Sequence, residues 1–135
     1  MAVLINKLKC ESYQIKARLK AQGFHNSDQL LAAVRTTAGR KNLASELDLD
    51  TEHVLKLANW ANLARIRGIG GVFSDLLEQA GVDTVKELAT RRPDNLHAKL
   101  AEINAKEDIA GRLPTLKAVK DWVAQAKELP GALDY

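Results

Sequence analysis

Cysteine, proline and aromatic residues are all scarce in this sequence. Its 135 residues include one cysteine, three prolines and eight glycines, and only 4% of them are aromatic. The single Cys10 can form no internal disulfide, which favours a reducing compartment and leads us to expect a cytoplasmic protein. So little proline and glycine excludes low-complexity and collagen-like chains. A core that relies on alanine and leucine suits closely packed helices better than sheets.

Long apolar runs are also missing. The apolar segment from Met1 to Ile5 is too short for a signal peptide or a membrane span. No segment of useful length alternates apolar and polar residues with the period of a strand. A chain of this length holds one core but not two independent ones. We therefore expect an all-α protein, with one compact domain over residues 1–135 and no contact with membranes.

Residue patterns typical of catalysis, metal binding or cofactor binding are absent. His25, His53 and His97 show no spacing that suits a metal ion, and no phosphate-binding loop of the P-loop type occurs. The run Gly68-Ile69-Gly70-Gly71 lacks the third glycine and the preceding strand of a dinucleotide site. We expect a protein that is not an enzyme and that needs no cofactor and no metal.

Positive charge is concentrated in the first half of the chain. The net charge is +3, but 11 of the 20 Lys and Arg and only 6 of the 17 Asp and Glu lie at or before Arg67. This imbalance favours a surface that faces nucleic acid or an acidic protein, or it is an uneven solvated surface. Lys16, Arg18 and Lys20 carry part of the charge on a helix expected from about residue 11 to 22.

Polar caps and prolines predict where most of the helices begin. These starts lie at Asn26, at Asp50 or Thr51, at Thr84, at Pro93 and at Pro114-Thr115. The stretch Thr36-Thr37-Ala38-Gly39 predicts a break before a short helix.

The stretch from Ile66 to Ala89 organises the rest of the chain. Gly68 and Gly70 flank Ile69 where one helix ends and another begins. Glycine adopts positive φ without a steric clash, so the pair suits a tight hairpin between helices, with Ile69 anchoring the turn in the core. The second helix would present unpaired amides and the positive end of its dipole, which attract phosphate. The alternative is a purely structural turn.

The same residues resemble a known family. Ile66-Arg67-Gly68-Ile69-Gly70, with Ser74 and the pair Leu76-Leu77 behind it, is similar to the second helix-hairpin-helix element of a domain-of-unknown-function family built as a tandem of such elements. The resemblance extends from about Ile15 to Leu129 and is strongest between Leu63 and Ala89. In the wider superfamily this hairpin grips DNA phosphates without reading bases, so the resemblance implies a binding module and names no substrate.

The two halves of the chain share a pattern, which predicts degenerate repeats over about residues 9–63 and 64–129. A shift of 58 relates Leu19 to Leu77, Gly23 to Gly81 and Leu30 to Leu88. A shift of 65 relates Val54, Leu57, Ala58 and Ala61 to Val119, Trp122, Val123 and Ala126. We expect the two copies to bury each other's apolar stripes. The first copy lacks the hairpin glycines, because Lys9-Cys10-Glu11-Ser12 stands in their place.

Two binding hypotheses follow. The first is non-specific contact with the phosphates of duplex DNA or another nucleic acid, made by Arg65, Arg67, Gly68, Ile69, Gly70, Gly71 and Val72. Asp75 and Glu78 oppose it, because they add negative charge to the same helix. The second is a protein-interaction or scaffold module in which Lys16, Arg18 and Lys20 engage an acidic partner. Trp60 and Trp122 either stack on bases or pack in the core.

Overall fold

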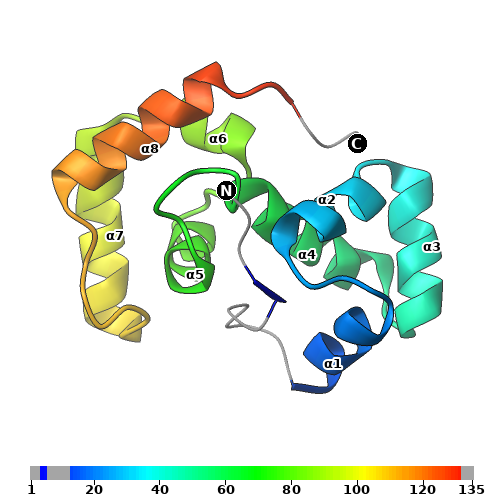
Figure 1. Cartoon of the computed structure of the whole chain (residues 1–135). Helices are drawn as coiled ribbons and strands as arrows, with labels where there is room; N and C mark the ends of the chain where they lie inside the picture. The colour runs from blue at the N-terminus through cyan, green and yellow to red at the C-terminus, as the bar shows by residue number, and fades with distance from the viewer. Residues whose placement is uncertain (1–3, 6–12, 132–135) are drawn as a thin grey trace.

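The computed structural model describes Leu4, Ile5 and residues 13–131, and over these residues the protein is compact and all-helical (Figure 1). Eight helices follow one another as α1 (Tyr13–Ala21), α2 (Ser27–Val34), α3 (Thr37–Leu47), α4 (Thr51–Leu63), α5 (Gly71–Gln79), α6 (Val85–Ala89), α7 (Pro93–Glu107) and α8 (Leu116–Glu128). The described residues form no strand beyond an isolated bridge between Leu4 and Asn26. The all-α expectation is confirmed.

None of the helices within the described ranges is both long enough and apolar enough to cross a membrane.

Side-chain caps define the helix starts, as the sequence predicts. Asn26, Asp50, Thr84 and Thr115 each accept a hydrogen bond from the amide three residues later, over 2.7–3.1 Å. Pro93 occupies the first turn of α7, where its missing N–H costs nothing. These boundaries depend on neighbours along the chain, and so local sequence is sufficient to predict them.

The predicted break at Thr36–Gly39 is shorter than expected, because α2 ends at Val34 and α3 already begins at Thr37. Thr36 caps α3 by accepting from the Gly39 amide over 3.0 Å, and the helix continues through Gly39. A side chain on Gly39 would overlap the carbonyl oxygen of Ala33, so glycine is needed for α2 and α3 to meet closely. The buried Arg40 then donates to the carbonyl of Val34 over 2.8 Å and closes the end of α2. The small and polar residues here mark a packed corner between helices.

The buried apolar side chains form two clusters, one in each half of the chain. The first runs from Ile5 to Ala61 and the second from Leu63 to Ala126. Helices α1 to α4 pack among themselves, as do α5 to α8, and α4 and α5 connect the two groups (Figure 1). The expectation that the halves bury each other's apolar stripes is therefore wrong. Each stripe is buried by helices of its own half, which are close in sequence.

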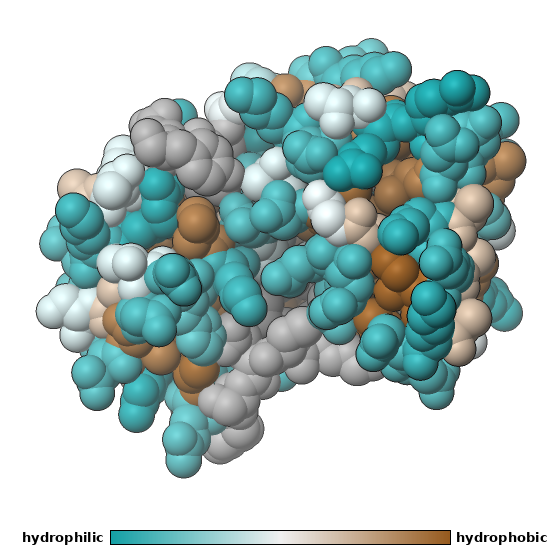
Figure 2. All heavy atoms as spheres, turned by 180° about the vertical axis from the view of Figure 1, so that it is seen from behind, coloured by the Kyte–Doolittle hydropathy of each residue, from teal (hydrophilic) through white to brown (hydrophobic). Residues whose placement is uncertain are grey.

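Seen from behind, hydrophilic side chains cover most of the surface (Figure 2). Apolar side chains reach the surface in separate patches rather than in one continuous face. Among the described residues, only Leu4 and Leu116 are large apolar side chains that count as exposed.

Candidate nucleic-acid interface

The hairpin between α4 and α5 is a tight turn that is anchored in the second core. The Ile66 amide donates to the Leu63 carbonyl over 3.0 Å, and the Ile69 amide donates to the Ile66 carbonyl over 3.2 Å. Ile69 is only 2% exposed and packs in the second cluster. Its position agrees with the anchoring role that the sequence predicts for it.

The two hairpin glycines have different roles. Gly68 has φ of +98°, and a Cβ there would lie 2.8 Å from Nε1 of Trp122. Both the backbone angle and the space therefore require glycine. Gly70 has φ of −104°, which any residue adopts, and an added Cβ would meet nothing within 4 Å. The turn needs only one residue with positive φ, and the missing side chain of Gly70 leaves open space beside the start of α5.

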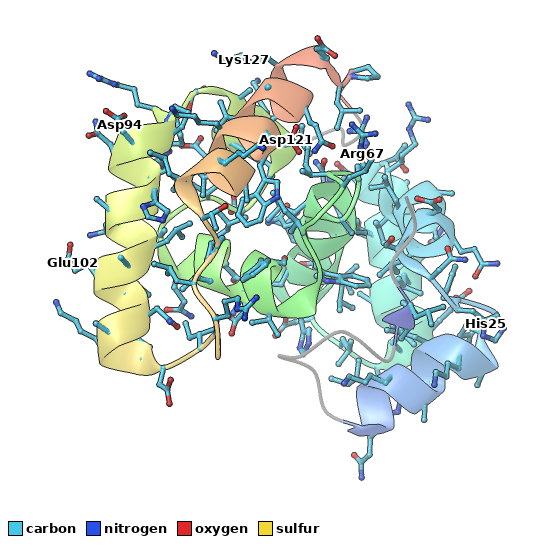
Figure 3. All side chains as sticks on the ribbon, turned by 60° about the vertical axis from the view of Figure 1, so that its left-hand side comes forward. His25, Arg67, Asp94, Glu102, Asp121 and Lys127 are labelled. Carbon is cyan, nitrogen blue, oxygen red and sulfur yellow. The ribbon has the colours of Figure 1, made fainter. Side chains whose placement is uncertain are left out.

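Helix α8 holds the hairpin from the side. The Arg67 amide donates to Oε1 of Gln125 over 2.9 Å, and Nε2 of Gln125 donates to the Arg67 carbonyl over 3.2 Å. Nε2 also donates to Asp121 one turn earlier on α8, over 2.8 Å. Trp122, from the same helix, packs against Phe73 with ring centroids 5.4 Å apart. Figure 3 shows the labelled Arg67 beside α8, which carries the labelled Asp121 and Lys127.

The first amides of α5 have no acceptor among the residues that the structure describes. The Ser74 amide donates to the Gly70 carbonyl over 2.9 Å and starts the helical ladder. Gly71, Val72 and Phe73 precede it, and within the described part of the chain their amides have no recorded acceptor. Gly70 has no side chain to cap them. Unpaired amides at a helix N-terminus form a site of positive potential that suits an oxygen anion.

The surroundings of these amides are mixed. Gly70, Val72 and Phe73 are partly exposed, whereas Gly71 is buried. Asp75 is partly exposed one turn further along α5, and its negative charge opposes a bound anion. The amides that a ligand could reach are therefore those beside Gly70, where no side chain covers the start of α5.

The two arginines predicted for the hairpin do not act together. Arg67 is exposed at the corner, next to Gly68. Arg65 is partly buried and lines two grooves that none of residues 66–72 lines. Burial lowers the pKa of the Arg65 guanidinium, the positive charge of Arg35 lowers it further, and Asp28 partly offsets both effects. Arg65 therefore belongs to a second region of the surface.

The three basic residues of α1 do not share one face of the helix. Lys16 and Lys20 lie one turn apart on one face, while Arg18 points away from them. Arg18 donates to the Leu47 carbonyl at the end of α3 over 3.0 Å, so it closes a helix within the protein. Lys20 is exposed and Lys16 is partly buried. The three side chains do not form a single patch.

Of the two roles considered for the tryptophans, base stacking finds no support in the side-chain geometry. Trp60 and Trp122 are 7% and 2% exposed, so neither indole is open to a nucleic-acid base. Among the residues that the structure describes, no group of three His, Cys, Asp or Glu is arranged to hold a metal ion. The first-copy hairpin at Lys9–Ser12 lies outside the described residues.

Sequence reasoning missed Gln125, which positions the hairpin, and Arg35, Lys86 and Lys127, which line the grooves beside Arg65. Each is distant in the chain from the residue beside which it lies, and no local pattern links them.

The comparisons with known proteins identify a family but no individual relative. No curated protein and no solved structure matches the chain significantly. The family model of a domain of unknown function, DUF4332, matches residues 9–129, which is most of the chain. The chain therefore belongs to the DUF4332 family, whose function is unknown.

Proposed function

We propose that the protein is a tandem helix-hairpin-helix module and that its second hairpin contacts the phosphates of a nucleic-acid backbone without reading sequence. The observation that carries this proposal is the open space at Gly70, next to the amides of Gly71, Val72 and Phe73, for which the described residues supply no acceptor. A phosphate oxygen approaches such amides closely only where no Cβ is in the way. Main-chain amides would donate hydrogen bonds to the phosphate, and because every nucleotide carries the same phosphate, such a contact does not depend on sequence.

The helix boundaries support the tandem arrangement. Helices α1 and α5 end at Ala21 and Gln79, a difference of 58. Helices α4 and α8 both have 13 residues and begin at Thr51 and Leu116, a difference of 65. These are the shifts that relate the apolar positions of the two halves.

The charges around the hairpin make the proposed contact weak. Arg67 adds one exposed cation at the corner, while Asp75 on α5 is a negative charge. Because each neutralised phosphate contributes a slope of about −0.9 to the dependence of log K on log salt concentration, one or two contacts give a slope between about −1 and −2. We expect binding at low salt that is lost near physiological ionic strength.

Gly70→Leu tests the hairpin directly. Since the φ of Gly70 is ordinary and the space beside it is open, the variant folds but covers the α5 amides with a side chain. Gly111→Leu is a matched control, because Gly111 also has open space, shows no positive φ and lies far along the chain in the α7–α8 connection.

The measurement is fluorescence anisotropy of a labelled 20-base-pair duplex at low salt, with two unrelated duplex sequences. Wild type and Gly111→Leu should bind both duplexes alike, and Gly70→Leu should bind neither. If Gly70→Leu retains wild-type affinity, the hairpin is not the contact and the proposal is wrong.

A further inference from the structure

Two neighbouring grooves share part of their lining at Arg65 and at the chain that follows α8. One has a volume of about 370 Å³ and lies between α2 and the chain that follows α8. The other, of about 450 Å³, lies between α6 and the end of α8. Both are lined by Arg65, Pro130 and Gly131, and we call the two together the inter-half groove.

Cations dominate the walls of the inter-half groove. Its described lining residues include Arg35, Arg65, Lys86 and Lys127, and Asp28 is the one carboxylate among them. No hydrogen bond or ion pair with another described residue is recorded for the side chains of Arg35, Lys86 or Lys127. Arg65 has one long contact, 3.5 Å from Nη1 to Oδ1 of Asn62. Among the described residues, Asp28 is the one acidic group in the lining that opposes these cations.

Holding these cations together costs free energy. Partial burial and the charge of Arg35 both lower the pKa of Arg65, which means that the folded protein disfavours its charged form. Arg65 nevertheless carries its charge at neutral pH, as arginine does in proteins. An anionic ligand would offset this cost, because it replaces repulsion between the guanidinium groups by attraction.

The rest of the lining selects among anions. Leu31 and Ala32 line the α2 side, and the α6–α8 side is lined by Val85, Ala89, Ala126 and Leu129. These aliphatic side chains offer no hydrogen bond or charge to a phosphodiester backbone, and the described lining residues include no aromatic side chain on which a base could stack. Aliphatic walls with cations match a peptide that alternates carboxylates with aliphatic side chains.

We propose that the inter-half groove binds an acidic segment of a partner protein, with its carboxylates on Arg35, Arg65, Lys86 and Lys127 and its aliphatic side chains on the apolar lining. This site is separate from the hairpin contact proposed above and does not depend on it. It also differs from an acidic-partner surface on α1, because Arg18 there is engaged with Leu47.

The binding probe is a fluorescein-labelled hexapeptide of alternating glutamate and leucine, measured by anisotropy with the whole chain. Two peptides separate the contributions: one in which serine replaces leucine keeps the charge, and one in which glutamine replaces glutamate keeps the apolar side chains. Both should bind at least about tenfold more weakly than the parent peptide. Equal binding of the serine peptide would overturn the proposal, because it would show attraction to net charge alone.

Arg35→Glu with Lys127→Glu reverses two exposed cations on opposite sides of the groove. The matched control, Lys56→Glu with Lys99→Glu, changes the net charge equally at exposed positions that line neither groove. We expect the groove variant to lose peptide binding at least about tenfold and the control to retain it within about twofold. Equal losses would overturn the proposal.

Duplex DNA distinguishes the two proposed sites. The groove variant should still bind duplex at least as well as the Lys56→Glu, Lys99→Glu control does, while Gly70→Leu should still bind the peptide. If the groove variant instead loses DNA selectively and excess duplex displaces the peptide, the groove belongs to a nucleic-acid site and the peptide proposal is wrong.

Discussion

Gln125 on α8 clamps the peptide groups on both sides of Arg67. Its side-chain amide accepts from the Arg67 N–H over 2.9 Å and donates to the Arg67 carbonyl over 3.2 Å. The same amide is oriented by Asp121. The last helix of the fold therefore determines the shape of a turn that lies 58 residues earlier in the chain.

Gln125→Leu should loosen the hairpin, because it removes both hydrogen bonds to Arg67 while keeping a side chain of similar length. We expect a loss of about 1–2 kcal/mol in the free energy of unfolding. Hydrogen exchange at the Arg67 amide should accelerate by more than that of the core of α4. Gln79→Leu, at an exposed position on α5, is the control and should change neither quantity much. Unchanged exchange at Arg67 in Gln125→Leu would contradict the clamp.

Gly68→Ala should be strongly destabilising, because the residue has φ of +98° and its Cβ would lie 2.8 Å from Nε1 of the buried Trp122. Positive φ costs a non-glycine residue roughly 1–2 kcal/mol, and displacement of the indole adds to this. Gly111→Ala should be nearly neutral in comparison. Urea unfolding monitored by tryptophan fluorescence measures the difference. Similar midpoints for the two variants would show that Trp122 and the turn adapt freely.

Gly70→Asp should stabilise the protein and abolish DNA binding at once. The extended conformation of Gly70 suits an N-cap, so the carboxylate accepts from the α5 amides and adds roughly 0.5 kcal/mol through capping and the helix dipole. The same carboxylate occupies the proposed phosphate position and repels the backbone. Gly70→Ser, an uncharged cap, should give a smaller gain and a weaker loss of binding. Thermal unfolding and duplex anisotropy together test this prediction, which fails if Gly70→Asp binds DNA as wild type does.

Arg65→Met should raise the thermal midpoint slightly. Because the pKa of Arg65 is lowered in the folded state, its protonated form is disfavoured there, and the penalty is fully present below the folded pKa. The penalty declines only as pH rises through that strongly alkaline value, so the gain from Arg65→Met should be constant across the neutral range. Since the side chain is largely solvated, the gain should stay below about 1 kcal/mol.

Arg35→Met tests the origin of that penalty by a double-mutant cycle. Each single replacement removes the same repulsion between the two guanidinium groups, so the gain of the double variant should be smaller than the summed single gains. Differential scanning calorimetry of the four proteins measures the coupling. Strict additivity would indicate that the two charges do not interact.

The helices could be predicted from the sequence because their signals are local. Asn26, Asp50, Thr84 and Thr115 act on amides three residues away, so a short window of sequence is enough to recognise each cap. The same reasoning failed at Gly39, because glycine is required there by the close approach of the Ala33 carbonyl on the preceding helix. The stretch Thr36–Gly39 has the composition of a loop, and only the contact between α2 and α3 explains the glycine within a helix.

The sequence by itself determined an all-helical chain, its capped helix starts and a glycine turn with Ile69 beneath it, because backbone angles and capping depend on near neighbours. Only the tertiary structure decided what surrounds that turn. It brought Gln125 into hydrogen-bonding distance of Arg67 and placed Trp122 against Gly68. It also separated Arg65 from Arg67, because the side chain of Arg65 lines a groove together with Arg35. These relationships join residues that are distant along the chain, and they exist only once α8 and α2 have packed in place.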